Sequence, residues 1–167
     1  MKGNRTRMTR IERIDADFFK GDGMLHGEVT DTIIKAFYKV YNTLGYGFLE
    51  KNYENALCIE LRKAGFQVVQ QHPVQVFYEE QQIGDYFADI VVNDLIILEL
   101  KAAEQLRREH VAQLTNYLKA TQKEVGLLLN FSTKPEFRRI VFTNQFKINP
   151  RESAQSASSA VYEGPNP

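Results

Sequence analysis

The sequence has little cysteine: Cys58 is the single one among 167 residues. One cysteine cannot form a disulfide within the chain or a metal site made of cysteines alone, which fits a reduced, cytoplasmic setting. No apolar run approaches the ~18 residues that a membrane span needs, so we expect no membrane partner. The basic start is not followed by an apolar core, and it therefore does not have the form of a secretory signal.

The sequence also lacks an excess of charge of either sign. Lysine and arginine number 21, as do aspartate and glutamate, and the formal net charge is zero. This balance excludes a surface coated in basic residues, although a local basic cleft stays compatible with it. The hydrophobic share of 43% is typical of globular proteins, and the length fits one domain with a core of useful size.

Composition divides the chain into three parts. Residues 1–25 are polar and basic, and we expect them to form a flexible arm. Residues 26–148 carry the apolar patterns of a folded domain. Residues 149–167 are rich in serine, alanine and proline, and we expect a disordered tail.

Apolar periodicity predicts an alternation of helices and strands along the domain. Thr30 is a candidate N-cap for the first helix, and Pro73 indicates an edge position or a bulge in the first strand. The order predicts an α+β fold, in which a mixed sheet is flanked by helices. The expected elements are helices at about 31–44, 48–64 and 104–121, and strands at about 67–78, 83–92, 95–101, 125–131 and 138–142.

The stretch from 89 to 101 dominates this pattern. It has the form of two strands joined by a turn at Asn93–Asp94, and the second strand is apolar almost throughout. Yet the first strand begins with Asp89, and the second ends with Glu99 and Lys101, whose side chains share one face. Because unpaired buried charges are costly, these groups must pair with one another, bind a metal or lie in a wet cleft.

The length of the turn decides whether the two carboxylates meet. A two-residue turn would place Asp89 opposite Leu98, with Glu99 on the wrong face. A three-residue turn, which pairs Val92 with Ile96, would place Asp89 directly opposite Glu99. A catalytic interpretation therefore requires the three-residue turn.

Two helical segments supply further candidates. Glu50 could reach a site built by the sheet, although spacing alone favours a solvated pair with Glu54. Gln113 and Tyr117 are neighbours on the helix that follows Lys101. Converging carboxylates can hold Mg²⁺ together with waters and a phosphate oxygen. A nearby lysine could then orient or activate a water, which gives the residue types of metal-assisted phosphodiester hydrolysis.

These residues also carry a family resemblance. The chain resembles the PD-(D/E)XK nuclease superfamily, and within it the branch named for a GxxExxY motif, over about residues 28–145. Ala88 stands where the superfamily signature has a proline. The motifs are Gly47-Phe48-Leu49-Glu50-Lys51-Asn52-Tyr53, Phe87-Ala88-Asp89, Ile97-Leu98-Glu99-Leu100-Lys101-Ala102, Gln113-Leu114-Thr115-Asn116-Tyr117-Leu118 and Gly126-Leu127-Leu128-Leu129-Asn130-Phe131.

The resemblance implies a restriction-endonuclease-like αβββαβ core and a nuclease that uses Mg²⁺ or Mn²⁺ on nucleic acid, with DNA ahead of RNA. Cutting both strands of a duplex would favour a homodimer. The alternative is a non-catalytic nucleic-acid-binding or protein-interaction module, in which Lys101 pairs with a carboxylate in place of metal. The implied catalytic residues are Glu50, Asp89, Glu99, Lys101 and Gln113, the metal ligands Asp89, Glu99 and Glu50, and the substrate-contact candidates Tyr117 and Tyr53.

Overall fold

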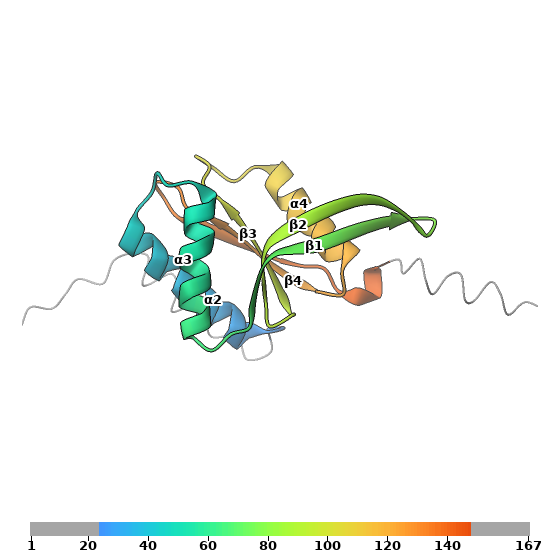
Figure 1. Ribbon diagram of the computed structural model, residues 1–167, viewed down its shortest axis with the longest axis horizontal. Helices are drawn as coiled ribbons and strands as arrows, with labels where there is room; N and C mark the ends of the chain where they lie inside the picture. The colour runs from blue at the N-terminus through green and yellow to red at the C-terminus, as the bar shows by residue number, and fades with distance from the viewer. Residues whose placement is uncertain (1–23, 148–167) are drawn as a thin grey trace, which may run out of the picture.

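A computed structural model describes residues 24–147 of the chain (Figure 1). The expectations for the N-terminal arm and the C-terminal tail fall almost entirely outside this range. No helix in the described range is long and apolar enough to cross a membrane. The range contains helices α2 (Gly27–Leu44), α3 (Glu50–Lys63) and α4 (Arg108–Ala120), strands β1 (Val68–Tyr78), β2 (Gln81–Val92), β3 (Ile96–Lys101), β4 (Val125–Asn130) and β5 (Glu136–Val141), and a short 3-10 helix (Asn144–Phe146).

The five strands form one sheet in the order β1-β2-β3-β4-β5. Strands β3 and β4 are parallel, and the other neighbours are antiparallel. This confirms the predicted α+β class with a mixed sheet. Strand β1 lies at an edge, as Pro73 indicated, because an edge strand tolerates a residue without a backbone donor.

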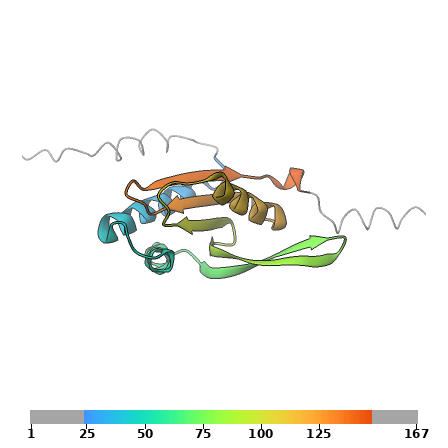
Figure 2. The same ribbon diagram turned by 90° about the horizontal axis from the view of Figure 1, so that it is seen from above.

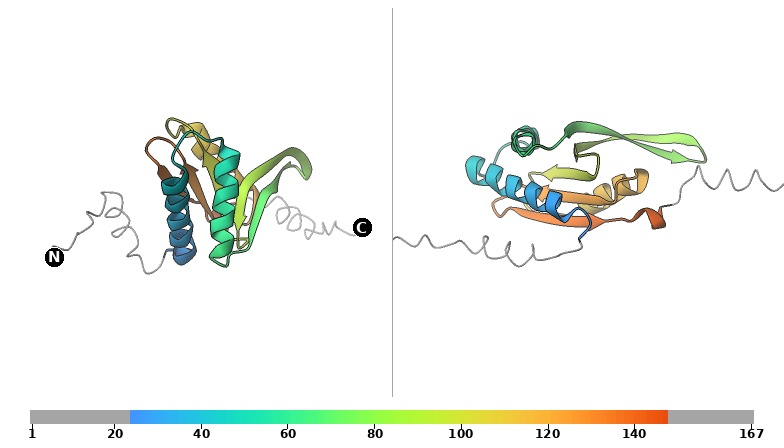
Figure 3. Two further views of the ribbon diagram at one scale, coloured as in Figure 1. Left: turned by 60° about the vertical axis from the view of Figure 1, so that its left-hand side comes forward. Right: turned by 90° about the horizontal axis from the view of Figure 1, so that it is seen from below.

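Helices cover both faces of the sheet. Helices α2 and α3 pack side by side on one face, where Leu98 and Leu100 of β3 join their core (Figure 3). Helix α4 packs on the other face against Ile97 and Leu128. Successive residues of β3 thus face opposite cores, and Glu99 and Lys101 follow Ile97 on the α4 face.

The β1–β2 hairpin extends well beyond the rest of the sheet (Figure 2). Strand β2 pairs with β3 only from Ile90 to Val92, whereas it pairs with β1 along nearly its whole length. Gln71 has a positive φ of 50° at a level where the β1–β2 pairing is interrupted, beside Asp89. We call residues 72–88 the distal arm. Beyond Gln71 this arm bends over α4, and Val74 and Ala88 join the core of that helix.

The helix starts differ from the sequence expectation. Helix α2 begins at Gly27, with His26 as its N-cap, so Thr30 is a buried helical residue and not the cap. Helix α4 begins at Arg108 and not near residue 104. The reason is a pair of long-range contacts, because side chains of Asn130 and Glu136 accept hydrogen bonds from the backbone of residues 103 and 106 and hold this segment out of the helix.

Candidate active site

The β2–β3 turn has the length that the site requires. Val92 pairs with Ile96, so three residues connect the strands. Asn93–Asp94 adopt left-handed conformations with φ of 51° and 57°, which these two residue types tolerate better than most. Continuing the register by one step places Asp89 opposite Glu99.

Asp89 lies at the point where β2 leaves β3. Its Oδ2 accepts a hydrogen bond from the backbone N–H of Leu100 at 2.8 Å. The carboxylate thus takes the place of a backbone acceptor at the end of the strand pairing, and this contact fixes its position. Burial raises the pKa of Asp89, and the Leu100 hydrogen bond and the charge of Lys101 oppose that rise.

Glu99 is the most deeply buried acid of the group, with an exposed fraction of 2%. Its Oε1 accepts a hydrogen bond from Lys101 Nζ at 2.7 Å. Its Oε2 is buried and has no hydrogen-bond partner in the described part of the protein. Burial, followed by the charge of Asp89, raises the pKa of Glu99 to about 7, and Lys101 only partly opposes this rise.

Lys101 brings a positive charge to this group of acids. Burial alone would lower its pKa, but the hydrogen bond to Glu99 and the charges of Glu99, Glu50 and Asp89 raise it above the usual value. In the metal-free protein Lys101 is therefore protonated at neutral pH. Its ammonium group donates a hydrogen bond to Glu99 and carries a positive charge.

Glu50 approaches from the opposite face of the sheet. It is the first residue of α3, and its Oε1 accepts a hydrogen bond from the backbone N–H of Ala102 at 3.1 Å, just beyond the end of β3. Its charge acts on Asp89, Glu99 and Lys101. The structure thus brings four of the predicted catalytic residues together at one end of the β2–β3 pair.

Glu54 has a role that its spacing did not indicate. It is buried, and it accepts hydrogen bonds from Lys51 and from the side-chain amides of Gln70 and Gln71. It is thus not the solvated partner of Glu50 that spacing alone favoured. Glu54 ties α3 to the bend in β1, and its charge also acts on Asp89.

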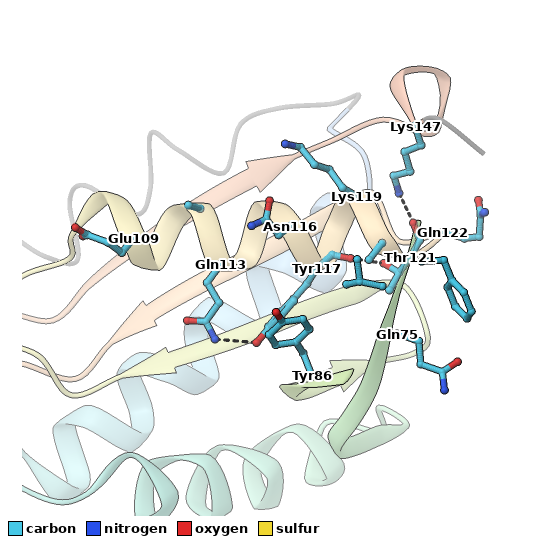
Figure 4. Close-up of a pocket in the computed structure, with 14 residues that line it drawn as sticks. Gln75, Tyr86, Glu109, Gln113, Asn116, Tyr117, Lys119, Thr121, Gln122 and Lys147 are labelled. Carbon is cyan, nitrogen blue, oxygen red and sulfur yellow. Dashed lines mark hydrogen bonds between the residues drawn. The ribbon is translucent and has the colours of Figure 1, made fainter. Parts of the chain in front are cut away.

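Gln113 and Tyr117 form a joint unit on α4. The Gln113 amide donates a hydrogen bond to the Tyr117 hydroxyl at 2.8 Å (Figure 4). Burial raises the pKa of Tyr117, and the charges of Glu99 and Asp89 add to this effect. Gln113 and Tyr117 both line a cavity of about 780 Å³.

The structure does not support Tyr53 as a substrate contact. Its side chain is fully buried, and its ring stacks on Phe131 with centroids 4.1 Å apart. Its hydroxyl donates to the carbonyl of Gly45 at 2.8 Å and accepts from the N–H of Phe48 at 3.2 Å. Tyr53 is a core residue that fixes the loop before α3. Its place in a motif did not reveal this, because burial depends on the whole fold.

The donor set fits a hard divalent cation. Among the residues that the structure describes, no group of three or more histidine, cysteine, aspartate or glutamate side chains is arranged to hold a metal. Mg²⁺, however, commonly takes only one or two carboxylates and completes its shell with water and phosphate oxygens. Asp89 and Glu99 supply two, and the unpartnered Oε2 of Glu99 is a buried acceptor that a cation would satisfy.

Comparison with known proteins gives one match. The sequence model of a family described as the PD-(D/E)XK nuclease superfamily matches residues 27–140, which is more than half of the chain. Nucleases of this superfamily generally use divalent metal ions. The three helices and five-stranded mixed sheet of the described residues are consistent with its restriction-endonuclease-like fold. No curated protein and no solved structure matches the chain.

Proposed function

The chain belongs to the PD-(D/E)XK nuclease superfamily, and from this membership and the geometry of the site we propose that it is a Mg²⁺- or Mn²⁺-dependent nuclease. The observation that carries the proposal is the buried, unpartnered oxygen of Glu99, which lies beside Lys101 and opposite Asp89. A structural ion pair alone would leave that oxygen unsatisfied, whereas a cation would satisfy it.

Asp89 and Glu99 would hold the cation, with Glu50 as a further ligand or as a contact to its water. When bound, the cation would supply positive charge to the scissile phosphate and lower the pKa of a coordinated water. In the proposed hydrolysis a water oxygen forms a bond to phosphorus while the bond from phosphorus to the leaving sugar oxygen breaks. The attacking water gives up a proton to the surrounding solvent, and the leaving oxygen takes up a proton.

Lys101 would position the attacking water and stabilise the negative charge that develops on the phosphate. Its raised pKa supports this role over proton removal, because the ammonium group keeps its proton at neutral pH. Gln113 would act from α4 as a positioning residue through the Tyr117 hydroxyl.

We also propose that the chain belongs to the GxxExxY branch, with residues 26–148 as its nuclease-like domain. Each fixed residue of the motif has a physical reason in the fold. Gly47 has a φ of 105°, which favours glycine. Glu50 binds the end of β3, and Tyr53 holds the loop between them.

The first test is cleavage of DNA with Mg²⁺ or Mn²⁺. We expect the wild type to cut, and Asp89→Asn and Lys101→Met to lose at least ~100-fold in rate, as the loss of one transition-state contact does. The asparagine keeps an acceptor for Leu100, so the fold should persist. Asp94→Asn, at the far end of the same hairpin, and Lys35→Met, on the exposed side of α2, are the matched controls.

Melting curves establish that the four variants are folded. Retention of cleavage by folded Asp89→Asn and Lys101→Met would refute the site assignment. Cleavage of DNA and RNA strands of the same sequence tests our proposal that DNA is the substrate. Analytical ultracentrifugation tests whether two copies of the chain associate, as cutting both strands of a duplex would favour.

The second candidate function is a non-catalytic binding module on the same fold. The 2.7 Å ion pair between Lys101 and Glu99 favours it, because that pair neutralises both charges without metal. The two candidate functions predict different responses of the protein to added metal. A nuclease site predicts that Mn²⁺ raises the melting temperature of the wild type and not that of Glu99→Gln, whereas a metal-free network predicts no rise in either protein.

A further inference from the structure

The cavity beside the site lies between α4 and the distal arm. The proposed function gives roles to Gln113 and Tyr117 on its α4 side, but to none of the residues on the side of the arm. Its volume of about 780 Å³ lies within the ~300–1,000 Å³ that ligand sites span. Figure 4 shows Tyr86 of the arm close to Tyr117 of the helix, and their ring centroids are 6.2 Å apart. Tyr86 lies three residues before Asp89 on β2, and Tyr117 packs in one core with Ala88 and Ile97, so the cavity adjoins the strands that carry the carboxylates.

The chemistry of the lining matches unpaired bases. Side-chain amides of Gln75, Asn116 and Gln122 line the cavity, and none of them has a hydrogen-bond partner among the described residues. Each amide offers both donors and an acceptor, as the edges of bases do. Tyr86 adds an aromatic side chain to the lining. This residue is 51% exposed, so a face of its ring is available for stacking.

The position of the Tyr86 ring is set by Gly84, two residues earlier on the arm. A Cβ atom at Gly84 would lie 2.7 Å from the Tyr86 ring, so the absence of a side chain there lets the ring lie along the strand. The neighbouring residue Phe87 is equally exposed, at 52%, but it does not line the cavity. The chain thus contains a matched pair of aromatic residues, one inside and one outside the cavity.

The cavity carries little charge. Its charged lining residues are Glu109, Lys119 and Lys147. The Lys147 ammonium is already engaged by the carbonyls of Thr121 and Lys123, at 2.7 Å each. Such a lining favours stacking and base-edge hydrogen bonds over neutralisation of phosphates. Bases within a duplex are already stacked and paired, so only an unpaired strand has faces and edges to offer.

We propose that this cavity binds unpaired bases of the substrate strand beside the scissile phosphate, so that the substrate contains a single-stranded segment. The proposal rests on the proposed nuclease function for the identity of the ligand as nucleic acid. It assigns Tyr86 as the stacking residue, and the free amides as contacts to base edges.

The test is binding of a fluorescent mixed-sequence DNA 12-mer, single-stranded or annealed to its complement, to the full chain in EDTA. We expect tighter binding of the single strand. Tyr86→Ala should weaken that binding about 5- to 150-fold, which is what the loss of one base–aromatic stack costs. Tyr86→Phe should retain the affinity, and Phe87→Ala should change it less than about twofold. The salt dependence should be unchanged in Tyr86→Ala, because no phosphate contact is lost.

Equal affinity for duplex and single strand, or equal losses in Tyr86→Ala and Phe87→Ala, would overturn the proposal. The absence of metal separates this result from hydrolysis. Tyr86-dependent binding by a protein that cuts nothing would overturn the nuclease function alone. Cleavage by a protein whose binding does not depend on Tyr86 would overturn the cavity assignment alone.

Discussion

At the scale of single residues, the site is a cluster of charges that the fold does not satisfy by itself. Glu99 is buried next to Asp89, and Lys101 compensates only one of its oxygens. The sequence allowed this cluster to be predicted because charged residues interrupt buried strands. It did not reveal that Tyr53 is enclosed by the core, or that Glu54 joins the hydrogen-bond network of β1, because both depend on packing between distant segments.

The raised pKa of Glu99 makes the metal-free protein sensitive to pH. A carboxyl group whose folded pKa, about 7, lies above its unfolded value of 4.5 contributes stability below about pH 4.5, and that contribution is lost as the pH rises through about 7. We therefore expect the melting temperature of Glu99→Gln to rise relative to that of the wild type between about pH 5.5 and 8.5. A constant difference across this range, measured in EDTA, would contradict the assigned environment.

At the scale of elements, the hairpin and helices were predictable in kind and order. Alternating and helical apolar patterns indicated the five strands and the three α-helices but not the short 3-10 helix Asn144–Phe146, and the turn at Asn93–Asp94 was found where its residues suggested. The bend at Gln71 was not predictable, because a glutamine gives no signal for a positive φ. Yet that bend directs the distal arm toward α4 and so forms one wall of the cavity.

The close packing of α4 on the sheet depends on Gly126 of β4. A Cβ atom there would lie 2.8 Å from Leu114 Cδ1 and 2.9 Å from its Cγ, and Leu114 is fully buried. We expect Gly126→Ala to lower the free energy of unfolding by ~1–3 kcal/mol through overpacking. Combining it with Leu114→Ala should cost less than the sum of the two single changes.

Chemical denaturation measures this coupling. Gly27→Ala is the control, because its Cβ would meet no atom closer than 3.5 Å and should cost little. Additive effects of Gly126→Ala and Leu114→Ala would show that the contact does not set the distance between α4 and the sheet.

At the scale of the whole molecule, the two faces of the sheet contribute different parts of the site. Helix α3 brings Glu50 around the end of β3 from one face, and α4 brings Gln113 and Tyr117 over the other. The carboxylates lie where β2 leaves β3, and the distal arm continues past α4. The order of elements predicted the core of this arrangement. The cavity between α4 and the arm follows from tertiary packing that no local pattern encodes.

The central claim is that Asp89 and Glu99 form a divalent metal site. Calorimetric titration of Mn²⁺ into the wild type, Asp89→Asn, Glu99→Gln and the control Asp94→Asn tests it most directly, because the result does not depend on the choice of substrate. We predict binding by the wild type and by Asp94→Asn, with a loss of at least ~10-fold in affinity in the other two variants. Binding of equal strength in all four proteins, or in none of them with a short DNA strand present, would contradict the account.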